Sequence, residues 1–206
     1  MPDGFFKWGG QFIVRNAQQL KTKDYQLAAK SGMNGLVLGV ESLSERVRDH
    51  MKKGFSNADL DYTLEQFRKN NLNCVFLIIV GYPTETEKDF EEVCAQFTKY
   101  QGYAIDGTIF GVNLGGTLSV DEGTPLDLNS HILDLDFSST TGNSKVFGLD
   151  WINKNNPNLT LEERIRRRIK LQELCMNLGY TVWNGDHQLH RLKESYDRIK
   201  QDTYHV

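Results

Sequence analysis

The chain has 206 residues, 39% of them hydrophobic, which is enough to bury the core of one domain of ordinary size. Its 24 Lys and Arg residues against 27 Asp and Glu give a formal net charge of -3, so nothing indicates a nucleic-acid partner. No stretch approaches the roughly 20 consecutive apolar residues of a membrane span, and the first residues lack the basic and apolar run of a signal peptide. The sequence therefore predicts a cytoplasmic protein without a membrane partner.

Three cysteines, Cys74, Cys94 and Cys175, are odd in number and far apart in the sequence. Such spacing favours neither a disulfide framework nor a zinc site. We therefore expect each cysteine to be a small core residue, and we expect no metal ligands.

Short apolar runs alternate with amphipathic stretches through the first two thirds of the chain, a pattern typical of βα units around a parallel sheet. The run 35–40 is nearly all apolar, as expected of a strand covered on both faces. Strands are predicted at 11–15, 35–40, 74–80 and 108–114. Helices are predicted at 24–30, from Ser44 to a stop at Gly54, at 57–70, and from Thr84 or Glu85 through Phe97.

Periodicity fails from about residue 115 to 158, which indicates a functional loop, a mobile lid or an unrecognised strand pair. The next helix begins at Thr160, which forms a capping-box pattern with Glu163, and ends at Gly179. We expect its four arginines to lie on a solvated face, or alternatively to bind a phosphate-bearing partner; they are Arg164, Arg166, Arg167 and Arg168. A last strand at 180–183 and a charged helix at 186–200 complete the prediction.

Ligands of parallel βα proteins meet the carboxyl ends of the strands, so the residues just after each apolar run are candidates for a site. Glu41 and Ser42 follow the second strand. A carboxylate there can accept two hydrogen bonds from a ribose diol, with a hydroxyl beside it. The alternative is that both residues only help to cap the next helix.

The third strand and the short helix offer further candidates. Gly81 would let the backbone approach a flat ring against which Ile79 packs, although such a turn is common in βα units. Lys53 lies at the end of the short helix, where it could complement the helix C-terminus or hold a ligand carboxylate.

Three motifs occur in a fixed order: Gly39-Val40-Glu41-Ser42-x-Ser44, Met51-x-Lys53-Gly54 and Ile79-x-Gly81-x-Pro83-x-Glu85-Thr86. Together they resemble the radical S-adenosylmethionine superfamily, particularly the type often fused to a cobalamin-binding domain. The resemblance is good over 11–93 and loose over 108–126. It implies an α/β fold with parallel strands, a partial (β/α) TIM-type barrel over 1–126, followed by a loop or lid over 127–158 and a C-terminal helical extension over 159–206.

The resemblance also implies residue roles in binding S-adenosylmethionine. Glu41 would hold the ribose hydroxyls with Ser42 beside it, and Lys53 would pair with the methionine carboxylate. The adenine would lie between Ile79 and Gly81.

Two further elements take part in this implied site. Backbone groups near Val112 and Asn113 would hydrogen-bond to the adenine. Arg15 would be a polar neighbour of the ligand, or alternatively a surface arginine.

The family binds a 4Fe–4S cluster through a CxxxCxxC loop, and this chain has no such spacing. We therefore expect S-adenosylmethionine as a ligand and no cluster on this chain alone. Radical chemistry, with methyl transfer as one option, is expected only if a cluster-bearing N-terminal half or partner subunit is supplied. Exposed Phe5, Phe6 and Trp8 would lie where that half packs. The alternatives are a non-catalytic half-barrel that acts as a binding or structural subunit, and an unrelated βα enzyme.

Overall fold

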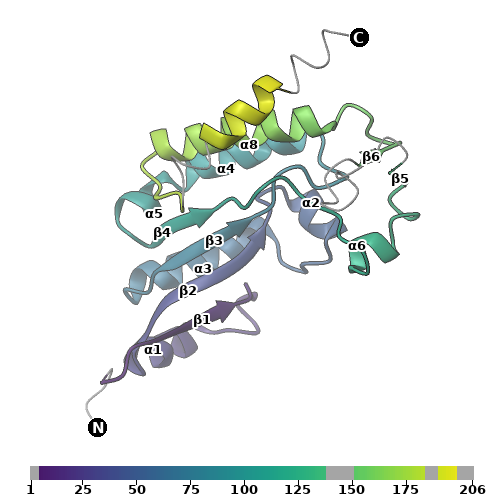
Figure 1. Ribbon diagram of the computed structural model, residues 1–206. Helices are drawn as coiled ribbons and strands as arrows, with labels where there is room; N and C mark the ends of the chain where they lie inside the picture. Colours follow the sequence, from purple (N-terminus) through teal and green to yellow (C-terminus); the bar gives the residue numbers. More distant parts are fainter. Residues whose placement is uncertain (1–4, 138–150, 184–189, 199–206) are drawn as a thin grey trace.

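The computed structural model of the chain describes residues 5–137, 151–183 and 190–198 (Figure 1). At its centre lies one parallel sheet in the order β1-β2-β3-β4. Neighbours in the sheet are thus neighbours in the sequence, as in a singly wound (β/α) barrel. The strands are β1 (Trp8–Phe12), β2 (Met33–Glu41), β3 (Cys74–Ile78) and β4 (Ile109–Asn113).

Helices follow the strands along the chain, which confirms the predicted α/β class with parallel strands and a helical C-terminal part. Ser56, Thr86 and Thr160 begin three of these helices, each accepting a hydrogen bond from the backbone N–H three residues later. The helices are α1 (Thr22–Lys30), α2 (Glu45–His50), α3 (Asn57–Lys69), α4 (Glu87–Lys99), α5 (Gln101–Ile105), α6 (Pro125–Leu128) and α8 (Leu161–Asn177).

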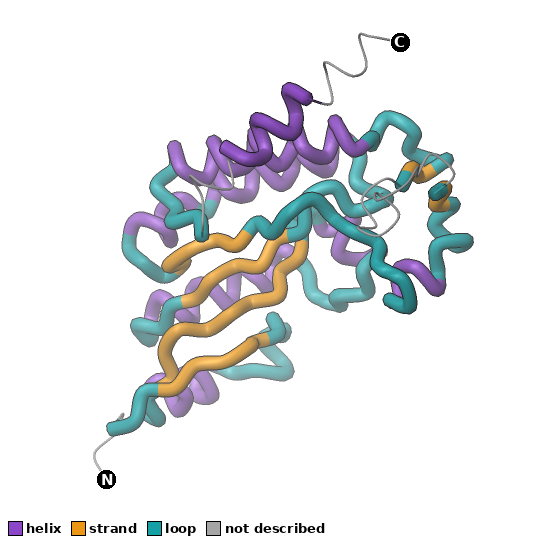
Figure 2. The backbone as a smooth tube through the Cα atoms, viewed as in Figure 1, coloured by secondary structure: helices purple, strands orange, loops and turns teal. Residues whose placement is uncertain are grey.

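The two faces of the sheet differ in burial. In β2, Leu36, Leu38 and Val40 are buried, whereas the alternate residues Val37 and Gly39 are only half-buried. Figure 2 shows the strands in full view from one side, with the helices α1 and α3 behind them. The expectation that β2 is covered on both faces is therefore wrong for the described residues, because helices cover one face only.

The main core lies between the sheet and its helices. Leu38 and Phe76 face each other across β2 and β3, and Phe76 in turn faces Val112 of β4; all three are completely buried. Helix α8 lies beside α4 (Figure 1) and adds Leu171 to the same core. The residues 159–177 thus pack on the barrel-like part of the chain.

Residue 180 joins α8 to the edge of the sheet. The Tyr180 hydroxyl donates to the Phe97 carbonyl at 2.7 Å, and the two rings lie edge to face. The predicted last strand is reduced to a single parallel bridge between Val112 and Val182. Residues 190–198 form part of the predicted final helix, and the rest of that prediction lies outside the described residues.

The segment without periodicity holds a short helix, α6, and a two-stranded antiparallel pair, β5 (Leu135–Asp136) and β6 (Ile152–Asn153). Among the three interpretations, the unrecognised strand pair therefore applies to its described residues. Trp151 is 1% exposed and packs with Val120 and Leu159 in a second, smaller core.

Several predicted boundaries are wrong by a few residues. The first strand begins at Trp8 rather than residue 11, and α2 ends at His50, well before Gly54. The short helix α5 was not predicted, because its five residues offer no apolar periodicity. Within the described parts of the chain, no helix is long and apolar enough to cross a membrane.

The expectation of a solvated arginine face on α8 is wrong for three of the four arginines. Arg164 and Arg168 are fully buried, Arg167 is 4% exposed, and only the Arg166 side chain is substantially accessible. Arg164 lies 3.7 Å over the Trp151 ring, and Arg168 donates to the Gly115 carbonyl at 2.9 Å. These arginines bind backbone and side chains of the protein itself, so they do not form a surface for a phosphate-bearing partner.

Candidate functional site

The end of β2 forms a tight turn that presents Glu41. Glu41 has a positive φ of 64°, which is uncommon for a residue other than glycine. The Ser42 N–H donates to the Val40 carbonyl at 2.8 Å, and the Ile79 N–H donates to the Glu41 carbonyl at 2.7 Å. The left-handed backbone of Glu41 is thus held by hydrogen bonds on both sides.

Glu41 forms an ion pair with Lys53. Their Oε1 and Nζ atoms are 2.8 Å apart, and the two side chains are 20% and 31% exposed. Gly39 provides the space for this pair, because a Cβ at position 39 would lie 2.9 Å from Glu41 Oε1 and 3.7 Å from Lys53 Nζ. A glycine two residues before the carboxylate is therefore part of the site.

The C-terminal end of α2 positions Lys53. The Lys53 N–H donates to the Arg48 carbonyl and the Lys52 N–H to the Asp49 carbonyl, both in the pattern of a Schellman motif. Lys52 is the left-handed residue of this motif, with φ 56°. Arg48 of the same helix is fully buried and donates a hydrogen bond to the Ser42 carbonyl at 2.8 Å. This bond ties α2 to the turn after β2.

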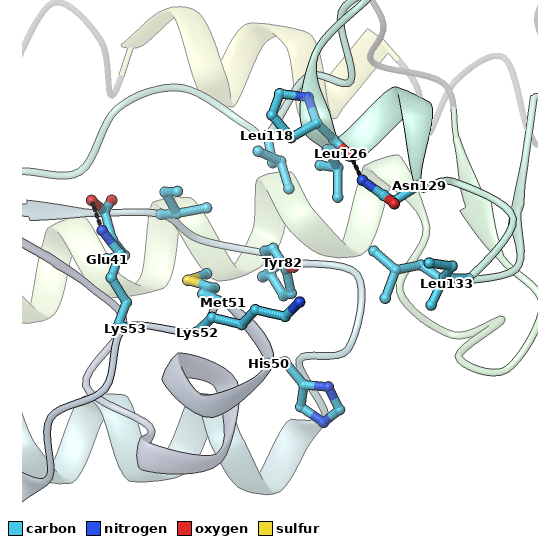
Figure 3. Close-up of a pocket in the computed structure, with 13 residues that line it drawn as sticks. Glu41, His50, Met51, Lys52, Lys53, Tyr82, Leu118, Leu126, Asn129 and Leu133 are labelled. Atoms are coloured by element: carbon cyan, nitrogen blue, oxygen red, sulfur yellow. Dashed lines mark hydrogen bonds and ion pairs between the residues drawn. The ribbon is translucent and has the colours of Figure 1, made fainter.

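Two cavities adjoin the ion pair. The larger has a volume of about 530 Å³ and is lined by Glu41, Lys53, Ile79 and residues from 118–133 (Figure 3). The smaller has a volume of about 490 Å³ and lies along the open face of the sheet, between Arg15, Gly39 and the same pair. Both volumes are in the range of pockets for small organic ligands.

The structure therefore brings four of the predicted site residues together, namely Glu41, Lys53, Ile79 and Arg15. Arg15 is exposed and lines only the smaller cavity. An exposed arginine beside this cavity agrees with both of its interpretations, so a role as a polar neighbour of the ligand stays a prediction.

Ser42 does not line either cavity. Its side chain is fully buried and its Oγ accepts a hydrogen bond from the Ser44 N–H at 3.2 Å. For Ser42 the structure matches the alternative interpretation, in which the hydroxyl supports the start of the next helix. The hydroxyl faces the protein interior, and its position beside a ribose stays a prediction.

Gly81 is covered by α8 instead of facing a ligand. Its φ of 77° requires glycine, and a Cβ there would lie 2.7 Å from the Arg164 side chain. The predicted close approach to a flat ring is thus replaced by a close approach to an arginine, and Gly81 lines neither cavity.

Val112 and Asn113 are also occupied by protein contacts. The Val112 N–H donates to the Thr181 carbonyl at 2.8 Å, and the Val112 carbonyl accepts from the Trp183 N–H at 3.0 Å. The Asn113 side chain accepts from the Gly115 N–H. Both backbone groups of Val112 are thus engaged by the chain after α8, and a contact with an adenine stays a prediction.

Buried charges hold the loop between β3 and α4. Glu85 is 1% exposed and pairs with Arg167 at 3.0 Å, while its second oxygen accepts from the Gly81 N–H. Burial raises the pKa of Glu85 to about 7, although the hydrogen bonds from Arg167 and Gly81 act in the opposite direction. The contact between Glu85 and Arg167 thus links α8 to the loop next to the candidate site.

Several residues of the site were missed by sequence reasoning. Lys52 and several mostly apolar residues of the segment 118–133 line the larger cavity, and Arg164 and Arg167 fix the loop beside it. Lys52 is the unspecified residue of the motif Met51-x-Lys53-Gly54, so its position next to Lys53 is the sequence feature that points to it. The segment 118–133 carries no regular period, so its packing against the strand ends follows only from the tertiary structure.

The cysteines do not fit an iron–sulfur cluster. Cys74 of β3 and Cys175 of α8 are fully buried, which raises the pKa of both thiols, and Cys94 of α4 is half-buried. Thiolates are the form that binds iron, and these residues lie in the core as predicted. Among the described residues, no group of three or more His, Cys, Asp or Glu is arranged to hold a metal ion.

Residues 11–97 match the family model described as the Radical SAM superfamily. No curated protein matches the chain. The solved structures that match include the radical S-adenosylmethionine methyltransferase TsrM from Kitasatospora setae with tryptophan substrate and a SAM analogue bound, at a TM-score of 0.52 and 11% identity. This match covers 88% of this chain and 44% of TsrM.

A second structure of the same enzyme, with cobalamin and a [4Fe-4S] cluster bound, matches at a TM-score of 0.51 and 14% identity, over 87% of this chain and 44% of the other. At these identities the similarity concerns the fold. The four-stranded parallel sheet and its helices are thus similar in fold to part of the matched structures, and the chain spans less than half the length of the solved structures it matches.

Proposed function

We propose that the chain, of which residues 11–97 match the Radical SAM family model, binds S-adenosylmethionine at the Glu41–Lys53 pair. The observation that carries this proposal is the 2.8 Å contact between the two side chains where both cavities meet, at the carboxyl ends of β2 and β3. A carboxylate and an ammonium at this edge match the ribose and carboxylate groups of the ligand in chemistry.

Each side chain keeps hydrogen-bonding capacity for a ligand. Lys53 contacts Oε1 of Glu41, and Oε2 receives no hydrogen bond from any described residue, so it is open to a ribose hydroxyl. An ammonium has three donors, of which Lys53 uses one on Glu41, so the others can hold a carboxylate. The ion pair would orient both groups before the ligand arrives.

Apolar surface for the adenine is available at Ile79, which lines the larger cavity beside the pair. Arg15 would lie on the opposite side, along the open sheet face. Ser42, Gly81 and Val112 take no direct part in this proposal, because their groups are engaged within the protein.

When a reduced 4Fe–4S cluster is supplied, bound S-adenosylmethionine provides radical chemistry. The cysteines of this chain do not fit such a cluster, so we assign the cluster to a segment outside it, either in a longer chain or in a partner subunit. The matched solved structures are of a methyltransferase, and methyl transfer is the reaction that we propose for the assembled enzyme.

The second candidate function is a non-catalytic half-barrel that acts as a binding or structural subunit. The placement of all three cysteines in the core or half-buried favours it. We further propose a division of the chain into a barrel part over 1–126, a loop or lid over 127–158 and a C-terminal helical extension over 159–206.

Calorimetric titration of the 206-residue chain with S-adenosylmethionine tests the proposal. Glu41→Gln and Lys53→Met should each weaken binding roughly 10- to 100-fold, the size expected for a charge-assisted hydrogen bond. The exposed pair Glu65 and Lys69 on α3, 3.1 Å apart, provides the matched controls Glu65→Gln and Lys69→Met. Unchanged affinity in the Glu41 variant would overturn the site, and absence of binding would favour the structural subunit.

A further inference from the structure

A second cation lies in the larger cavity beside the ion pair. Glu41 is the only carboxylate among the residues that line this cavity, and Lys53 already pairs with it. Lys52 lines both cavities and is exposed to solvent, and its ammonium contacts no carboxylate or other hydrogen-bond acceptor within the described residues. The cavity therefore has an excess positive charge.

The backbone at Lys52 favours glycine over lysine. Lys52 occupies the left-handed position of the Schellman motif that ends α2, with φ 56°. A side chain with a Cβ is strained there. The position nevertheless carries a long cationic side chain, and strained residues of this kind gather at binding sites.

Figure 3 shows the direction of this side chain. Lys52 extends away from the Glu41–Lys53 pair, toward the side of the cavity where Tyr82 and Leu133 lie. A ligand at the pair and a ligand group at Lys52 would thus occupy different parts of the cavity.

The cavity beyond Lys52 is mostly apolar, although His50, Tyr82 and Asn129 also line it. Leu118, Leu126, Ile132 and Leu133 line it, all from the segment that follows β4. These side chains can pack on a hydrocarbon or ring but offer no hydrogen bonds. An ammonium at one end and an apolar wall at the other define a ligand with one anionic group and an apolar body.

We propose that this part of the larger cavity binds an apolar molecule bearing one carboxylate, with Lys52 as the partner of the carboxylate. The assignment of this molecule as the substrate rests on the proposed function, because the reacting ligand would lie at the neighbouring ion pair. Its binding does not depend on S-adenosylmethionine. The whole cavity, including the part at the ion pair, has a volume of about 530 Å³, which is in the range of pockets for small organic ligands.

Two matched compounds test the charge requirement: 1-naphthylacetate and its neutral amide, 1-naphthylacetamide. In titrations of the 206-residue chain, the acid should bind at least fivefold more tightly than the amide. Lys52→Asn should abolish this difference while leaving amide binding unchanged, because asparagine accepts the left-handed backbone and so preserves the fold. Leu126→Ser should weaken both compounds.

Lys88→Asn is the matched control, since Lys88 is exposed on α4 and lines neither cavity. It should leave both affinities as in the wild type. Equal affinity for acid and amide, binding of neither compound, or an equal effect of Lys88→Asn would each overturn the proposal.

These experiments test the S-adenosylmethionine site and the carboxylate site independently, so that either proposal can be contradicted without the other. Titration with S-adenosylmethionine alone, with Glu41→Gln as the variant, tests the ion-pair site. If that titration fails while the naphthylacetate preference still depends on Lys52, the proposed function falls and the carboxylate site stands. The reverse outcome removes only the carboxylate site.

Discussion

Small steric features decide the geometry of the candidate site. Gly39 leaves room for the Glu41 carboxylate, and the hydrogen bonds around Glu41 hold its backbone at a positive φ. Such an arrangement costs about 1–2 kcal/mol for an ordinary residue, so surrounding contacts must maintain it. The ion pair is thus positioned by the backbone and does not depend on a flexible surface contact.

A Cβ at position 39 should displace the ion pair without unfolding the chain. Gly39 has no positive φ, so alanine fits its backbone, but the added atom would lie 2.9 Å from the Glu41 carboxylate. We expect Gly39→Ala to weaken S-adenosylmethionine binding about tenfold, or about 1.4 kcal/mol. Gly10→Ala in β1 meets nothing within 4 Å and serves as the control in the same titration. Equal affinities for the two variants would contradict this steric role.

Glu85 should make stability depend on pH. Its pKa is raised from 4.5 to about 7, so the folded state holds the proton more tightly than the unfolded state. The free energy of unfolding should therefore fall as pH rises from about 4.5 to 7, and level off above that. Thermal melts between pH 5 and 8 should show this slope in the wild type and a smaller one in Glu85→Gln. A slope that is identical in both would assign the dependence to another group.

At the scale of the elements, the positions of strands and helices can be predicted from the apolar periods and capping residues of the local sequence. The strands β2 and β3 and the helices α3 and α4 lie where their apolar periods predict, within a few residues. The burial of Arg164 and Arg167 could not be predicted in this way, because their partners Trp151 and Glu85 come from distant segments. A charged residue is expected at the surface unless the tertiary structure supplies partners for it.

The cap of α8 should contribute to stability. The Thr160 hydroxyl accepts a hydrogen bond from the Glu163 N–H, which is one half of the predicted capping box; the Glu163 carboxylate instead pairs with Arg166 and Arg167. Thr160→Ala should lower the free energy of unfolding by about 1 kcal/mol in chemical denaturation. Thr22→Ala is the control, because Thr22 is exposed on α1 and its side chain forms no hydrogen bond with a described residue; a loss of similar size there would argue against capping as the cause.

At the scale of the whole molecule, one face of the sheet is open in the described residues. Ile13 and Phe110 are each 58% exposed, and Trp8 of the edge strand β1 is 46% exposed. The predicted exposure of Phe5, Phe6 and Trp8 is confirmed, while the segment or subunit that would cover them stays a proposal.

We expect this open face to cause self-association of the isolated chain. Exposed apolar side chains and a free strand edge both favour contacts between copies. Sedimentation velocity should show a larger average mass at higher concentration, and Ile13→Lys together with Phe110→Lys should reduce it. A control double variant, Leu27→Lys with Leu128→Lys, removes exposed leucines from helices α1 and α6 and should have less effect. A monomer at all concentrations would contradict the expectation.

From the sequence one can predict which residues come together at the candidate site, but not which of their groups stay accessible to a ligand. Glu41, Lys53 and Ile79 come together because consecutive strands of a parallel sheet end at one edge. The groups of Ser42, Gly81 and Val112 are all engaged within the protein: Ser42 by the neighbouring Ser44 N–H, and Gly81 and Val112 by residues far away in the sequence. Local motifs specify which residues reach the edge of the sheet, whereas tertiary contacts decide which of their atoms stay accessible.

The burial of Trp151 gives the protein an optical reporter. It is the most buried of the three tryptophans at 1% exposed, whereas Trp8 and Trp183 are 46% and 39% exposed. One indole should therefore fluoresce at shorter wavelength and resist quenching by iodide, while the other two are quenched. Because Arg164 lies over the Trp151 ring, a red shift of this protected emission would signal that α8 has separated from the loop it covers.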